Sequence, residues 1–171
     1  MGMKAEIRAS LGWNWSDEAL LNERLDYAAQ LLDGSGANQA EAAWLADAQT
    51  LLDAGSTTYD LTDLTRTLLG DMHVTTLLAV RAVLLINHNT SAGTLIVGGA
   101  TSNVWSAPFG DGSDKLVVPP DGVALLSTRA SGWAVDASNC NLKLAADGGE
   151  VDYSIAVIGN LTASGSGSSS G

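Results

Sequence analysis

Apolar and polar residues alternate without a break over the first part of the chain. Every odd position from Met3 to Trp15 is apolar, and every even position from Lys4 to Asn14 is polar or glycine. Successive side chains of a strand point to opposite faces of a sheet, so a period of two indicates a strand. The pattern predicts a strand over residues 3–15 with its odd positions buried, and it favours core packing for Trp13 and Trp15.

The next segment, Ser16 to Asp33, fits two patterns. Ser16 could cap a helix that ends before Gly34, with leucines on one stripe. The stretch from Leu25 to Leu31 also alternates as a strand would. We expect a short helix or loop followed by a strand, and then a glycine-containing loop over residues 34–38.

The middle of the chain reads as a series of short strands. We expect strands at residues 43–52, 57–61, 77–87 and 94–97, and the apolar run 77–87 suits a strand covered on both faces. Residues 62–76 show no clear period, and we expect a mixed connection with room for a helical turn.

The strongest pattern lies between Lys115 and Gly159, where apolar runs alternate with turn residues. The runs cover residues 115–118, 123–128, 133–135, 139–144 and 151–158. Between the first two, proline presets φ and Gly122 accepts a positive φ. Strands at this spacing predict an all-β fold, a single antiparallel sandwich resembling a jelly roll. We assign it to residues 1–162, with room for one short helix near the N-terminus.

The end of the chain, Ala163 to Gly171, is almost entirely serine and glycine. Such a segment has too little apolar surface to offset the entropy of ordering it. It predicts a flexible tail outside the domain.

Composition excludes several classes of partner. With 8 Lys+Arg against 19 Asp+Glu the formal net charge is -11, which argues against nucleic acid or an anionic membrane. One cysteine, Cys140, rules out an intrachain disulfide and a multi-cysteine zinc site, and we expect it to be a small buried thiol. Neither a signal-peptide pattern nor an apolar run of bilayer length is present, so we expect synthesis in a reducing cytoplasm and no membrane insertion.

No arrangement of residues predicts catalysis, a metal or a cofactor. His73 and His88 stand apart from any paired-histidine motif, and no serine before the tail follows a nucleophile-elbow pattern. The loop Asp111 to Asp114 places oxygen ligands close together but lacks the further carboxylates of a calcium loop, so a hairpin turn is favoured. We therefore expect a protein that is not an enzyme.

Trp105 and Phe109 form the one candidate contact site. Both lie in a loop, where aromatic rings can be exposed. An exposed indole can stack on a sugar or anchor an interface between subunits. The sequence leaves both uses open.

Several segments between Leu31 and Gly159 resemble small virion structural proteins of tailed bacteriophages. The shared features are turn glycines and core apolar residues. The matching segments are 33–40, Trp44, 50–51, 54–55, 60–61, 79–83, 97–100, Asn103, Trp105, 108–109, 118–122, 132–135 and 153–159.

The resemblance implies a non-enzymatic building block of the phage particle. On it we expect a virion protein, an outer decoration or accessory protein of the capsid that contacts itself in a homo-oligomer and other virion proteins. A tail or fibre component is the alternative within this class. A carbohydrate-binding module that uses Trp105 to attach to a host glycan is the alternative from another class.

Overall fold

The structure is a computed structural model that describes residues 2–16 and 20–161. These residues form strands and no helix, which confirms the all-β prediction. Within them no helix is therefore available to cross a membrane. The tail from Ala163 lies outside the described residues. The strands are β1 (Ala5–Ser16), β2 (Leu20–Asp33), β3 (Gln39–Ala40), β4 (Ala42–Leu51), β5 (Ser56–Asp60), β6 (Leu64–Leu68), β7 (Asp71–Thr75), β8 (Ala79–Asn87), β9 (Thr94–Gly98), β10 (Lys115–Val118), β11 (Val123–Ser127), β12 (Trp133–Ala134), β13 (Asn141–Asp147) and β14 (Val151–Asn160).

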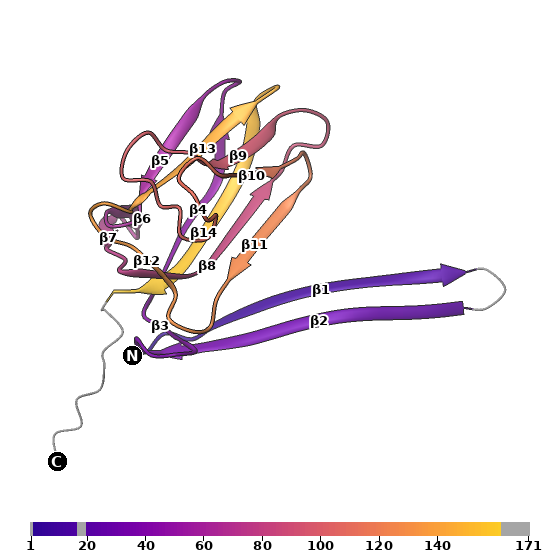
Figure 1. The fold of residues 1–171 in the computed structure, drawn as a ribbon, viewed down its shortest axis with the longest axis horizontal. Helices are drawn as coiled ribbons and strands as arrows, with labels where there is room; N and C mark the ends of the chain where they lie inside the picture. Colours follow the sequence, from indigo (N-terminus) through magenta and orange to yellow (C-terminus); the bar gives the residue numbers. More distant parts are fainter. Residues whose placement is uncertain (1, 17–19, 162–171) are drawn as a thin grey trace, which may run out of the picture.

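Two sheets make up the body of the molecule (Figure 1). One has the order β11-β8-β14-β4, with β12 pairing with β8, and the other has the order β10-β9-β13-β5. Alternate residues of both sheets point inward into one core: Val83 and Leu85 on β8 join Leu142 and Leu144 on β13. The period of two thus sets which residues are buried, and Cys140 is among them, as expected.

The strands expected from residue 43 onward form close to their expected bounds, and two earlier expectations are wrong. Residues 20–33 are one continuous strand, so the strand expected in this segment forms but is longer than expected, and no helix forms within residues 20–33. Residues 62–76 do not form an irregular connection, because β6 and β7 pair there as a hairpin. In both places the backbone N–H and C=O groups form hydrogen bonds between paired strands.

A long hairpin, β1 with β2, leaves the body and projects far beyond it (Figure 1). We call it the arm. Its register pairs Ala5 with Leu31 at the base and runs without interruption to Ser16 with Leu20. Twelve paired residues at about 3.4 Å each give an arm about 40 Å long. Among the described residues, none forms a second layer over most of the arm.

A buried arginine holds the base of the arm against the body. Arg81 on β8 has no exposed surface. It donates hydrogen bonds to Asn160 Oδ1 (2.6 Å), to the carbonyls of Gly36 (2.9 Å) and Ser35 (3.2 Å), and to that of Ala130. Asn160 in turn donates to the carbonyl of Gly34 (2.8 Å). The loop that follows β2 is thereby tied to two body strands, which fixes the direction of the arm.

Candidate contact surfaces

The arm carries an apolar face that is interrupted by one charged residue, Glu23, which pairs with Trp13. The paired residues Leu11 and Leu25 lie on this face, and so do Trp13 and Tyr27. Near the base the same face is buried: Ile7, Ala29 and Leu31 pack on the body.

Beyond the base this face is open to solvent. Leu11 is 66 % exposed, Leu25 69 %, Trp13 43 % and Tyr27 41 %. The expectation that the odd positions of the first strand are buried is therefore wrong beyond residue 7, and Trp13 is not a core residue. The side chain of Trp15 is outside the described part of the structure. Alternation does predict an amphipathic strand here, but residues 2–16 and 20–161 do not supply a layer that covers it.

The opposite face of the arm is polar and internally paired. Arg8 bonds Glu6 at 2.8 Å, and Arg24 bonds Asp26 at 2.7 Å. Ser10 Oγ donates to the Asp26 carboxylate at 2.6 Å. This hydroxyl and then Arg24 lower the pKa of Asp26 below its ordinary value. The polar face is thus suited to water, and the two faces of the arm differ sharply.

A second apolar surface lies on the outer side of the sheet that contains β8 and β14. We call it the outer face. Ile7 from the arm packs in one cluster with Ala82, Leu125 and Ile158 of this face. Past that contact the apolar residues continue, because Leu84 and Ala156 are only half-buried.

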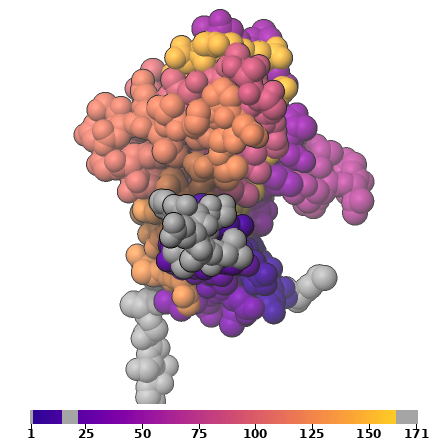
Figure 2. All heavy atoms as spheres, turned by 90° about the vertical axis from the view of Figure 1, so that its right-hand side faces the viewer, coloured from indigo at the N-terminus to yellow at the C-terminus, as the bar shows by residue number. Residues whose placement is uncertain are grey.

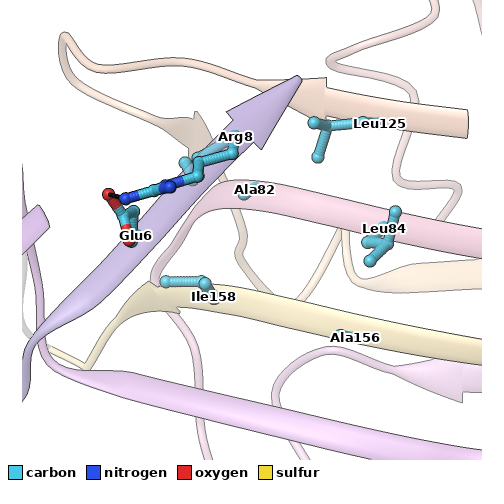
Figure 3. Close-up of a pocket in the computed structure, with 8 residues that line it drawn as sticks. Glu6, Arg8, Ala82, Leu84, Leu125, Ala156 and Ile158 are labelled. Carbon is cyan, nitrogen blue, oxygen red and sulfur yellow. Dashed lines mark ion pairs between the residues drawn. The ribbon is translucent and has the colours of Figure 1, made fainter. Parts of the chain in front are cut away.

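A cavity of about 200 Å³ opens where the arm leaves the sheet (Figure 3). The arm forms one wall through Glu6, Ile7 and Arg8, and the outer face forms the other. Figure 3 shows Leu84, Leu125 and Ile158 along the sheet wall, with Glu6 and Arg8 paired on the arm. The arm and the outer face therefore bound a wedge that is apolar on its sheet side.

The hairpin β6–β7 is a second and shorter projection, seen in magenta at the right of Figure 2. We call it the finger. Its exposed apolar side chains are Leu68, Leu69, Met72 and Val74, and Leu69 is fully exposed. Leu69 and Gly70 form its two-residue turn, both with positive φ (54° and 96°). A leucine left fully exposed by the described part of the chain is suited to contact with another molecule.

Trp105 is not the exposed ring that the sequence led us to expect. It is 1 % exposed, and its indole Nε1 donates to the carbonyl of Ala134 at 3.1 Å. Phe109, half-buried, packs edge-on against it, with ring centroids 6.2 Å apart. The loop folds back over the open end of the core, so the indole faces inward and cannot stack on a sugar as placed. Loop position alone did not reveal this burial.

Sequence reasoning missed a polar cluster on the outer face. Ser154 Oγ donates to Asp47 Oδ1 at 2.5 Å and lies 2.7 Å from His88 Nε2. The Ser154 hydroxyl is the main cause of a lowered pKa at Asp47. In a hydrolytic triad the histidine lies between serine and carboxylate; here the serine lies between the other two.

The cluster has a structural role. It lies where the pairing of β4 with β14 shifts register, and Ala48 N also donates to Ser154 Oγ there. We therefore assign these residues to stabilising a β-bulge.

The remaining candidate residues occupy ordinary structural positions. Asp111 accepts hydrogen bonds from Ser113, and its own N–H bonds Asp114, so both carboxylates serve the turn. His73 is exposed on the finger and far from His88 along the chain. Within residues 2–16 and 20–161 no group of three metal-ligating side chains comes together.

The chain has no match among known family models, and none was found among curated proteins. Function must therefore be argued from the surfaces themselves.

Proposed function

We propose that this chain is a non-enzymatic structural protein of a bacteriophage virion, an outer decoration protein of the capsid made in the host cytoplasm. One observation carries the proposal: an all-β body presents two projecting hairpins that both carry large apolar side chains exposed to solvent. Large exposed apolar surfaces in a soluble chain are typical of contact sites. A particle protein makes such contacts with many neighbouring copies.

The arrangement of the body supports this class. Among the body strands, β4 and β14 are neighbours in one sheet, and β5 and β13 are neighbours in the other. This pairing of early with late strands is what the jelly-roll expectation requires, a fold used by viral capsid proteins. Fold alone does not define function, so the projecting hairpins remain the main argument.

A tail or fibre component is the second candidate. The length and fixed direction of the arm favour it, because an arm held by Arg81 can interlock successive subunits along an axis. The carbohydrate alternative loses its proposed ring, since Trp105 is buried.

The proposal is tested by locating the protein on particles. Antibodies raised against the recombinant chain are used for immunogold electron microscopy of phage particles purified from the host that carries the gene. Label over the head supports decoration, and label along the tail supports the second candidate. Unlabelled particles, with the protein left in the soluble lysate, would overturn both.

A further inference from the structure

The exposed part of the arm is a two-stranded ribbon with little to stabilise it in water. A two-stranded hairpin without a covering layer is marginal at best. This one is long, and its distal apolar face holds Leu11, Trp13, Leu25 and Tyr27, all well exposed. Together these side chains leave on the order of 400 Å² of apolar surface in solvent, as much as the largest patch on a typical monomer. A partner that covers this face would stabilise the arm.

The molecule itself shows which surface fits this face. At the base of the arm, Ile7 and Leu31 are buried in the cluster that includes Ala82 and Ile158 of the outer face. The distal arm continues the same apolar face but points away from its own sheet (Figure 1). The outer face also continues beyond the contact, through Leu84 and Ala156. The apolar face of the distal arm and the outer face are thus matching surfaces, and the described residues of one chain leave both of them partly exposed.

We propose that the distal arm of one copy packs on the outer face of a second copy, and that this exchange of arms assembles the protein into a homo-oligomer. In a reciprocal exchange, two arm faces and the two sheet patches beneath them are buried. The total is on the order of 1,600 Å², the usual size of a specific protein interface. The charged face of each arm, with its Arg24–Asp26 pair, stays in water.

The proposal rests on the proposed role of the chain as a contact-making protein, and it adds the partner and the surfaces. It also accounts for Arg81: an arm that must reach a neighbour in a set direction needs a rigid base. Exchange of identical elements closes when every arm finds a sheet, and such exchange is a low-cost route to dimers.

The first test measures mass in solution by light scattering, using the full chain. We expect a mass at least twice 17.5 kDa. The double variant Leu11→Thr/Leu25→Thr changes a cross-strand pair on the apolar face and keeps residues that favour strands. It should raise the dissociation constant about 100-fold or more.

The matched control is Asn14→Thr/Asn22→Thr, a cross-strand pair on the polar face of the same arm. It should leave the mass unchanged. A monomeric natural chain, or equal weakening by both double variants, would overturn the proposal. Circular dichroism of each variant confirms that the body is folded.

The second test identifies the receiving surface by crosslinking between copies. A Leu25→Cys chain is mixed with a Leu84→Cys chain and oxidised gently; Cys140 is buried and stays unreacted. We expect at least tenfold more disulfide-linked dimer in the mixture than in either chain alone. Leu25→Cys with Val117→Cys, on the opposite sheet, is the control and should give none. Dimer formed by Leu25→Cys alone would mean that arms pair with arms, and it would overturn docking on the outer face.

These results are separable from the virion proposal. A 17.5 kDa monomer that still labels phage particles would overturn arm exchange and leave the virion role standing. An oligomer with the expected crosslink that never labels particles would overturn the virion role and support arm exchange.

Discussion

Replacing Arg81 with methionine should destabilise the protein by about 3–5 kcal/mol, because it leaves several hydrogen-bond acceptors without a donor. The guanidinium has no exposed surface and bonds four neutral oxygens. Each acceptor left without a donor costs about 1–3 kcal/mol. Part of that loss is recovered, because the buried charge no longer has to be kept out of water; the same desolvation lowers the pKa of Arg81.

The assay is urea unfolding followed by circular dichroism, with Arg129→Met as the matched control. Arg129 is exposed and bonds Asn38 in the same loop, so its loss should cost about 0.5 kcal/mol or less. Arg81→Lys keeps the charge but loses the planar set of donors, so it should fall between the two. A loss under about 1 kcal/mol for Arg81→Met would refute the view that this side chain holds the base of the arm.

A local measurement separates loss of the arm base from loss of the whole fold. Leu32 N bonds the carbonyl of Asn38, and Asn38 N bonds the carbonyl of Arg129. In Arg81→Met, hydrogen exchange at these two amides should speed up under conditions where the body strands remain protected. Equal acceleration in β13, far from Arg81 in the other sheet, would point to a general loss of stability instead.

Three further predictions concern separate features. Leu69→Asn should stabilise the fold by about 0.5–1 kcal/mol in urea unfolding, because the turn needs a positive φ that asparagine accepts more readily; a destabilised variant would show that Leu69 makes a contact within its own chain. Burial raises the pKa of the Cys140 thiol, so a thiol reagent at pH 8 should react about 100-fold more slowly with the native chain than with the unfolded chain, and equal rates would contradict its burial. Asp136 accepts a hydrogen bond from the backbone N–H of Ser138 (2.7 Å), which lowers the pKa of its carboxyl below the ordinary 3.8. The stability that this adds is complete above pH 3.8 and is lost as the pH falls through the lower pKa of the folded state. The urea midpoint should therefore be level from about pH 7 to 5 and drop below about pH 4, and the drop should be less steep in Asp136→Asn.

Most of the body could be predicted from sequence because its strands are short and bounded by turn residues. The turn before β11 forms where Pro119 to Gly122 indicates it, with Gly122 N bonding the carbonyl of Pro119. Its details differ from the expectation: Asp121, and not Gly122, takes the positive φ (57°). Gly122 is needed for another reason, since a Cβ there would lie 2.6 Å from the oxygen of Pro119. The pattern located the turn, but its internal geometry depends on contacts that the pattern does not contain.

The arm shows a different limit. Alternation over residues 3–15 states that one face is apolar, and the rule that apolar faces are buried then placed it in the core. Both statements are physically sound, and only the second fails here, because Leu11 and Leu25 pair with each other and the described residues leave both of them mostly exposed. If the burial rule holds for the assembled protein, the covering layer comes from another molecule. The expectation of burial then fails where the interface with that molecule begins, between buried Ile7 and exposed Leu11.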